Sequence, residues 1–177
     1  GESLRERIRQ GPIPLRTAIS ILRDVARALQ YAHAEGVIHR DIKPENVLLS
    51  GDVAVVTDFG IAKAVSAAGS ETLTQTGMMI GTPAYVSPEQ AAGETNLDGK
   101  SDQYSLACVV YEMLSGERPF AGATPQAVMA KLFTERPKAL RTMRTAMPES
   151  GDKAVGRAMS NDASGRYSTT AQFGQGL

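Results

Sequence analysis

The chain has 177 residues, of which 42% are apolar, and its 19 basic side chains balance 19 acidic ones. This length is sufficient for one domain with its own core, and a formal charge of zero argues against binding to nucleic acid or to an anionic membrane surface. Cys108 is the single cysteine, which excludes an internal disulfide and fits a reducing compartment, so we expect a cytoplasmic location.

The chain begins with two predicted helices. Leu4 and Ile8 lie four residues apart among charged residues, as on a short amphipathic helix. A longer helix is predicted from about Leu15 to Ala34, because apolar residues recur there every three or four positions and Gly36 provides a natural end. The apolar face of this helix consists of Ala18, Leu22, Val25, Leu29 and Ala32.

Short strands are predicted next. Val37 and Ile38, Val47 to Leu49, and Val53 to Val56 are β-branched or apolar runs typical of strands. Ser50 to Asp52 separates the last two runs and has the composition of a turn, so these two runs are predicted to form a hairpin.

A long loop and further helices are predicted after the hairpin. From Asp58 to Glu89 no apolar period is visible, and a loop of this length in a compact domain is usually functional. A central helix is predicted from Ser101 to Ser115 with Gly116 as its cap, and Thr124 followed by Pro125 indicates the start of another. Shorter helices are predicted near 151–159 and 168–174.

Short motifs occur in a fixed order along the chain. They read HRDIKPEN at His39 to Asn46, DFG at Asp58 to Gly60, GTP at Gly81 to Pro83 and SPE at Ser87 to Glu89. Their order and spacing resemble the signature of protein kinases, specifically the eukaryotic-like (Hanks-type) bacterial serine/threonine kinases. The resemblance implies a mainly α (α+β) fold: the kinase C-terminal lobe, a helical bundle with a small β-hairpin that carries the catalytic loop.

The residue types in these motifs suit phosphoryl transfer, which needs positioning and charge neutralisation more than covalent chemistry. Magnesium prefers oxygen ligands, and Asp58 and Asn46 can supply a carboxylate and an amide oxygen. Asp41 lies five residues before Asn46, so both can face one site, where a carboxylate can orient a hydroxyl group and accept its proton. The ammonium group of Lys43 can offset charge on the transferring group.

By resemblance, Asp41 is the catalytic aspartate, and Lys43, Asn46 and Thr82 complete the catalytic set. Asn46 and Asp58 are expected to hold the metal ions, Mg²⁺ or Mn²⁺. The partners implied are ATP and proteins that offer Ser or Thr hydroxyls.

The resemblance also implies a nucleotide site, with Leu48 as the floor under the adenine. Glu45 is placed in this site, although it could instead contact a basic residue of a peptide substrate. The expected cofactor-binding residues are Lys43, Glu45, Asn46, Leu48 and Asp58.

Regulation is expected through the long loop. Arg40 directly precedes Asp41, and a phosphate on the loop could pair with its guanidinium group. Thr74 and Thr76 best match the autophosphorylation positions of the bacterial kinases, which suggests a homodimer for autophosphorylation.

Structural roles are expected for three further residues by the same resemblance. Glu89 and Arg166 resemble a buried ion pair that ties the end of the loop to the last helices. Asp102 resembles a helix aspartate that braces the backbone of the catalytic loop.

The sequence contains no G-x-G-x-x-G motif and no matching strand lysine, which a complete kinase uses to hold ATP. Residues 1–177 are therefore expected to be a partial kinase domain, the C-terminal lobe, whose partner is the N-terminal lobe of the same polypeptide. The full-length protein could be anchored to a membrane by a C-terminal segment. The isolated chain is expected to bind ATP weakly.

Two other functions compete with an enzyme fragment. A lobe that lost catalysis would be a non-catalytic, pseudokinase-like binding module, but it would have no need to keep Asp41, Asn46 and Asp58. A purely structural helical domain gives no reason for the catalytic-loop motif.

Overall fold

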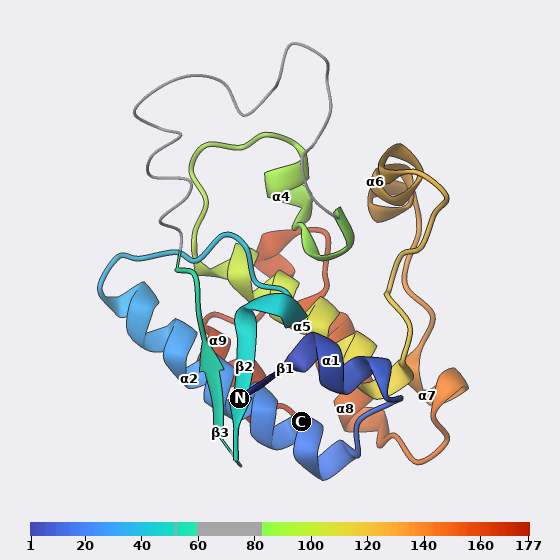
Figure 1. The fold of residues 1–177 in the computed structure, drawn as a ribbon. Helices are drawn as coiled ribbons and strands as arrows, with labels where there is room; N and C mark the ends of the chain where they lie inside the picture. Colours follow the sequence, from blue (N-terminus) through green and yellow to red (C-terminus); the bar gives the residue numbers. More distant parts are fainter. Residues whose placement is uncertain (52, 60–82) are drawn as a thin grey trace.

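The structure is a computed structural model, and it describes residues 1–51, 53–59 and 83–177. Helices gather around the central helix α5 (Gly99–Ser115), and a small sheet lies beside α2 (Leu15–Ala34) (Figure 1). Within the described ranges, no helix is both long and apolar enough to cross a membrane.

The sheet has three antiparallel strands in the order β1-β2-β3. They are β1 (Glu2–Ser3), β2 (Val47–Ser50) and β3 (Val53–Val56). Side chains alternate between faces of the sheet, as strand geometry requires. The buried side chains belong to Val47, Leu49, Ala54 and Val56. The predicted hairpin is therefore confirmed, and one face of it joins the core.

The strand predicted at Val37 and Ile38 is wrong, because the third strand is Glu2–Ser3 at the start of the chain. The backbone N–H of Val37 donates to the carbonyl oxygen of Ala32 at 2.8 Å and so closes the end of the preceding helix. The backbone N–H of His39 then donates to a side-chain carboxylate. Because the N–H groups of Val37 and His39 already have these partners, they cannot also form the hydrogen bonds that would pair this segment with a neighbouring strand.

Helix α5 (Gly99–Ser115) is the centre of the core, and every residue from Ser101 to Leu114 is buried. Helices α2 (Leu15–Ala34), α8 (Glu149–Ala158) and α9 (Thr170–Gln175) pack against it. A helix buried on all sides is normally apolar all round, yet α5 also buries polar side chains, which need partners within the protein. These are Ser101, Asp102, Gln103, Ser105 and Glu112.

The predicted long helices are confirmed, with small differences at their ends. The bounds of α2 match the prediction, whereas α5 begins two residues before Ser101. The carboxylate of Asp98 accepts a hydrogen bond from the N–H of Lys100 at 2.8 Å and caps this earlier start. Gly116 ends α5 in the left-handed conformation, with a φ of 78°.

Several shorter helices complete the fold. Helix α6 is Pro125–Thr134, as Thr124 and Pro125 predicted, while α7 (Leu140–Met143) was not predicted. The N–H of Leu140 donates to the Asp152 carboxylate at 2.8 Å, so a tertiary contact starts this one-turn helix. The remaining helices of the described ranges are α1 (Leu4–Arg9), α4 (Pro88–Ala91), η1 (Pro44–Asn46), η2 (Pro83–Tyr85) and η3 (Ala163–Gly165).

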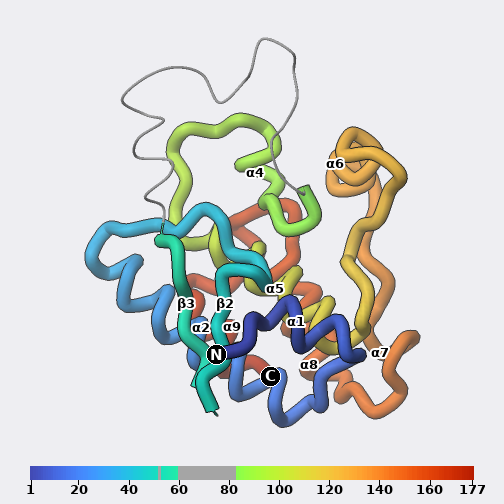
Figure 2. Tube along the Cα trace, in the orientation of Figure 1, coloured from blue at the N-terminus to red at the C-terminus, as the bar shows by residue number. Residues whose placement is uncertain are grey.

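The segment 37–46 crosses from α2 to β2 beside the N-terminal end of α5 (Figure 2). Asp102 of α5 accepts hydrogen bonds from the backbone of this segment, and the segment continues directly into β2. The predicted catalytic loop lies on this crossing.

Candidate active site

Two residues of the predicted site have an unusual backbone. Arg40 and Asp58 have φ angles of 68° and 58°, in the left-handed region that side chains other than glycine seldom adopt. Such conformations persist only where the surrounding structure holds them, and they cluster at functional sites. Both residues belong to motifs that the sequence singled out.

Asp41, Lys43 and Asn46 lie together on the crossing segment. The Nζ atom of Lys43 donates to Oδ2 of Asp41 at 2.7 Å. The Nδ2 atom of Asn46 donates to the Asp41 carbonyl oxygen at 2.8 Å and to its Oδ2 at 3.3 Å. Asn46 is buried, whereas the Asp41 side chain is 55% exposed. A fixed amide thus holds a carboxylate that is open to a substrate.

The same geometry leaves oxygen atoms for a metal ion. Both of these hydrogen bonds of the Asn46 amide use its nitrogen, so neither of them occupies its Oδ1. The backbone N–H of Thr57 donates to the Asn46 carbonyl oxygen at 2.9 Å, which brings the exposed Asp58 close to Asn46. An amide oxygen and a carboxylate fit a hard divalent cation. Among the described residues, no cluster of three or more His, Cys, Asp or Glu side chains is placed to hold a metal ion.

His39 is fully buried and ties the crossing segment to the segment after β3. Its Nδ1 accepts a hydrogen bond from the backbone N–H of Asp41 at 3.2 Å. The proton of the neutral ring therefore lies on Nε2, which donates to the Thr57 carbonyl oxygen at 2.8 Å. The ring also contacts that of Phe59, at 4.8 Å between centroids. His39 is used as a structural link and not as an exposed acid or base.

Asp102 lies below the crossing segment, on the first turns of α5. Its Oδ2 accepts the backbone N–H of His39 at 2.8 Å, and its Oδ1 accepts that of Arg40 at 2.8 Å. Nε2 of His33, on α2, lies 2.8 Å from the same Oδ2. The sequence singled out Asp102 but not His33, which carries no local motif that would mark it.

Glu89 and Arg166 form a bidentate ion pair. The Arg166 guanidinium donates to Oε1 and Oε2 of Glu89 at 2.7 and 2.9 Å, and the Arg166 side chain is fully buried. It also donates to the backbone carbonyl oxygens of Lys100 and Ser160. Burial alone would raise the pKa of Glu89, but hydrogen bonds from Arg166 and Ser101 hold that pKa below its ordinary value.

A second buried cluster was missed from the sequence. The Arg5 guanidinium donates to Glu45 at 2.8 Å, to Glu112 at 2.8 Å and to the Tyr85 hydroxyl group. Burial and the neighbouring Glu112 raise the pKa of that hydroxyl group. The cluster links α1, η1, η2 and α5, and it places the Glu45 carboxylate on Arg5. Its members are far apart in sequence, so no spacing could have predicted it.

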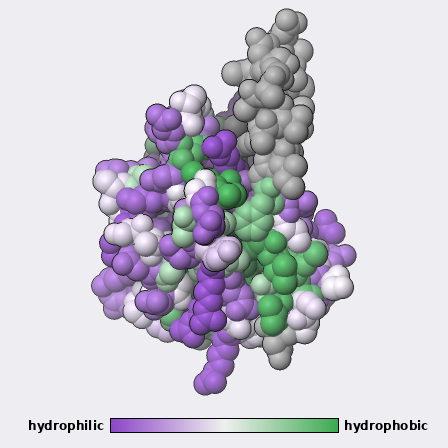
Figure 3. Space-filling model, turned by 90° about the vertical axis from the view of Figure 1, so that its left-hand side faces the viewer, coloured by the Kyte–Doolittle hydropathy of each residue, from purple (hydrophilic) through white to green (hydrophobic). Residues whose placement is uncertain are grey.

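The outward face of the hairpin carries apolar side chains. Leu48 is 38% exposed, and Val53 and Val55 are 55% and 46% exposed. Leu48 pairs with Val55 across the strands, so these side chains form one patch. Figure 3 shows hydrophobic surface on the side of the molecule that includes the hairpin.

Three predicted site residues lie outside the described residues. They are Thr74, Thr76 and Thr82.

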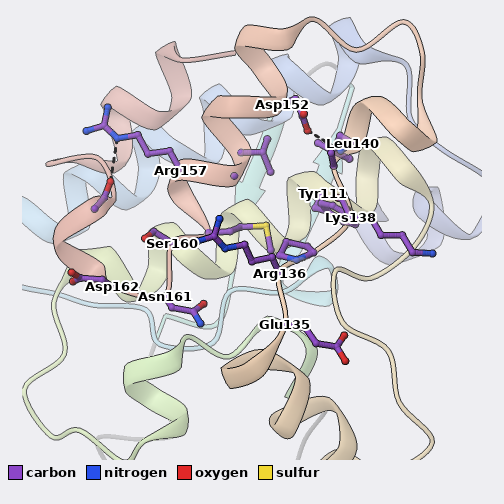
Figure 4. A pocket seen from close by; sticks show the side chains of 16 residues that line it. Tyr111, Glu135, Arg136, Lys138, Leu140, Asp152, Arg157, Ser160, Asn161 and Asp162 are labelled. Carbon is purple, nitrogen blue, oxygen red and sulfur yellow. Dashed lines mark hydrogen bonds between the residues drawn. The ribbon is translucent and has the colours of Figure 1, made fainter.

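A pocket of about 640 Å³ lies elsewhere, between the segment that joins α6 to α7 and the end of α8 (Figure 4). Tyr111, Arg136, Lys138, Arg157 and Asn161 are among its lining residues. None of the described site residues lines this pocket. It is therefore separate from the catalytic-loop region.

Comparisons with known proteins agree with the motifs. A family model described as "Protein kinase domain" matches residues 1–172. The chain is 44% identical over 175 residues to the serine/threonine-protein kinase PknB of Mycolicibacterium smegmatis and 39% identical to a probable PknB of Bifidobacterium longum. These alignments cover 98% of this chain but only 28% and 25% of the relatives, so the chain spans about a quarter of their length.

Solved structures show the same fold. The kinase domain of Mycobacterium tuberculosis PknI matches with a TM-score of 0.74 and 25% identity, over 99% of this chain and 60% of that one. Rad53 in complex with AMP-PNP matches with a TM-score of 0.75 and 27% identity, over 98% of this chain and 43% of that one. The expected kinase-like fold and the expected resemblance are thus confirmed, and the chain belongs to the protein kinase family.

Proposed function

We propose that this chain is the C-terminal lobe of a serine/threonine protein kinase, which transfers the γ-phosphoryl group of ATP to Ser or Thr hydroxyls of proteins. One observation carries the proposal: an exposed Asp41 carboxylate is held by Lys43 and Asn46 on a loop that the core helices support. The names of the relatives, serine/threonine-protein kinases, agree with it.

The chemistry follows from these side chains. The Asp41 carboxylate would accept a hydrogen bond from the substrate hydroxyl, orient its oxygen toward the phosphoryl group and take up its proton. Lys43, 2.7 Å from Asp41, would keep this carboxylate in place and offset charge on the phosphoryl group. Asn46 and Asp58 would hold Mg²⁺ or Mn²⁺. Such an ion neutralises charge on the phosphate oxygens when it is bound.

The proposal includes an N-terminal lobe of the same polypeptide. The sequence has no glycine-rich loop to cover the phosphates of ATP, and the chain covers 60% of the matched PknI kinase domain chain. The apolar hairpin face at Leu48, Val53 and Val55 would meet this lobe and the adenine ring. Burying it would remove exposed hydrophobic surface from water.

Regulation would act through the loop between the described segments. A phosphate on Thr74 or Thr76, added by a second copy of the kinase, would pair with the Arg40 guanidinium. Thr82 would contact Asp41 and Lys43. These assignments come from the resemblance to the bacterial kinases, whereas the proposed cytoplasmic location rests on the single cysteine, Cys108.

Phosphoryl transfer by the polypeptide that contains this chain and its N-terminal lobe tests the proposal. With ATP, Mg²⁺ and a Ser/Thr peptide, we expect phosphopeptide to form, and Asp41→Asn to lower kcat by about 10²- to 10⁴-fold. Glu149→Gln, at an exposed carboxylate of α8, is the control and should leave kcat unchanged. Equal activity of Asp41→Asn and the parent would refute the assignment. A parent that binds partners but transfers no phosphate would be the non-catalytic binding module.

A further inference from the structure

A pair of carboxylates lies beside the proposed acceptor site. Glu45 belongs to η1, between Lys43 and Asn46, and both of these neighbours contact Asp41. The Glu45 side chain is 46% exposed, and it shares a guanidinium partner with the buried side chain of Glu112 on α5. We call Glu45 and Glu112 the acidic pair. Two carboxylates in this position would attract a Lys or Arg residue of a substrate peptide if nothing else occupied the space between them.

Arg5 of α1 occupies that space. Its Nε donates to Oε1 of Glu45 at 2.8 Å, and its Nη1 donates to Oε1 of Glu112 at 2.8 Å. Its Nη2 donates to the Tyr85 hydroxyl group, which in turn donates to Oε2 of Glu112. Each nitrogen atom of the guanidinium group therefore has an acceptor within the protein, and the Arg5 side chain is only 11% exposed.

The charges around the acidic pair cancel. Burial disfavours a charged Arg5, but hydrogen bonds to Glu112 and Glu45 hold its pKa above the ordinary value. Burial would likewise raise the pKa of Glu45, but the hydrogen bond from Arg5 holds that pKa below its ordinary value. Arg118 adds a second positive charge, with its Nε 3.8 Å from Oε1 of Glu112. Two guanidinium groups thus balance two carboxylates, which leaves no net negative charge to attract a basic side chain.

We propose that Arg5 is a specificity-determining residue that occupies the acidic pair, so that the kinase does not select basic residues next to the acceptor Ser or Thr. A substrate Lys or Arg could reach both carboxylates only by displacing a guanidinium group that the core already holds and that would then be buried without a partner. The effect on substrates rests on the proposed function, whereas the occupation of the acidic pair by a guanidinium group does not.

Chemical rescue of the 177-residue chain tests the guanidinium site by itself. Arg5→Ala removes the side chain beyond Cβ, and the ethylguanidinium ion has the size of the part removed. A ligand that binds only the folded state stabilises it, so we expect about 20 mM ethylguanidinium chloride to raise the melting temperature of Arg5→Ala by about 2 °C or more. Sodium chloride at the same concentration should not raise it, and ethylguanidinium should not stabilise the parent. No rise in the variant, or an equal rise in the parent, would overturn the proposal.

Substrate choice is measured in the polypeptide that also carries the N-terminal lobe. The substrates are a Ser/Thr peptide with alanine on both sides of the acceptor, and copies in which one alanine at a time is replaced by arginine. For the parent, we expect kcat/KM of each arginine peptide to stay within about twofold of that of the alanine peptide. Arg5→Ala should raise this ratio about tenfold for at least one position, the gain expected from one hydrogen bond to a charged group. A loss of folded enzyme would lower kcat/KM for both peptides equally and leave the ratio unchanged.

Two further variants identify the group that receives the arginine. Arg5→Ala/Glu45→Gln should lose the gain, because the amide of glutamine carries no charge. Arg5→Lys keeps the charge but replaces the planar fork with one compact ammonium group, so it should fold even if Arg5→Ala does not, and raise the ratio about threefold.

A parent that already favours an arginine peptide about tenfold would overturn the proposal. An unchanged ratio in both Arg5→Ala and Arg5→Lys would also overturn it, as would a gain that survives Glu45→Gln. If the parent transfers no phosphate to any peptide, the proposed function fails, and the rescue experiment still decides whether a guanidinium group fills the acidic pair.

Discussion

Removing the Glu89 carboxylate should cost the protein a large part of its stability. In Glu89→Ala, the fully buried guanidinium of Arg166 would keep its charge without a counter-charge. Breaking a buried ion pair in this way costs about 3–5 kcal/mol. Because Arg166 also donates to backbone carbonyl oxygens, which remain in place, we expect the lower end, about 3 kcal/mol in the free energy of unfolding.

Urea denaturation of the chain, followed by far-UV circular dichroism, measures this loss. With an m-value of about 2 kcal/mol per molar, a loss of about 3 kcal/mol lowers the midpoint by about 1.5 M. The control is Glu149→Ala, which removes an exposed partner of Lys153 and should leave the midpoint unchanged. A midpoint for Glu89→Ala equal to that of the control would refute the reasoning.

The pKa of Glu89 also predicts how this stability depends on pH. The folded-state pKa is lowered from the ordinary value of 4.5, so the unfolded chain binds a proton more readily than the folded one. The ion pair therefore stabilises the protein fully above about pH 4.5, and its contribution decreases as the pH falls through the lower folded-state pKa. Glu89→Gln should show a shallower loss of stability between neutral and acidic pH. An identical pH dependence in the variant and the parent would contradict this sign.

Three other changes test the fold. Leu22→Ala, at a fully buried site of α2, should cost about 2–5 kcal/mol in urea denaturation, and a cost below 1 kcal/mol would show that the site is not packed as described. Gly116→Ala should lower the melting temperature, because φ is 78° there and a Cβ would lie 3.2 Å from Pro12 Cγ; an unchanged value would argue against this cap. Burial raises the pKa of the Cys108 thiol, so it should react with a thiol reagent only in denaturant, and fast reaction of the folded chain would disprove its burial.

Part of the site could be predicted from the sequence because its residues belong to short, contiguous motifs. The motif from His39 to Asn46 keeps Asp41, Lys43 and Asn46 within one loop, so their contact needs no long-range information. Asp58 could be joined to them because the hairpin returns the chain to the same place. Glu89 and Arg166 could be paired only through the resemblance to the kinases, since 77 residues separate them.

The order of strands in the sheet could not be predicted from the sequence in this way. Val37 and Ile38 have strand-like side chains, but their segment closes α2 and then donates its backbone N–H groups to Asp102. Glu2 and Ser3 have no such preference, yet they pair with β2. Strand pairing depends on which segments meet in space, so local composition is a weak guide to it.

The sequence by itself determined the long helices, the glycines that follow α2 and α5, and the family, because an apolar period, a terminal glycine and a contiguous motif act over a few neighbouring residues. Only the tertiary structure showed which side chains pair with the buried charged groups of Arg5 and Asp102. Arg5 with Glu112, and His33 with Asp102, are 107 and 69 residues apart. Each of these contacts exists because burial in the core makes an unpaired charge costly, and the fold alone determines which side chains are near enough to meet that requirement.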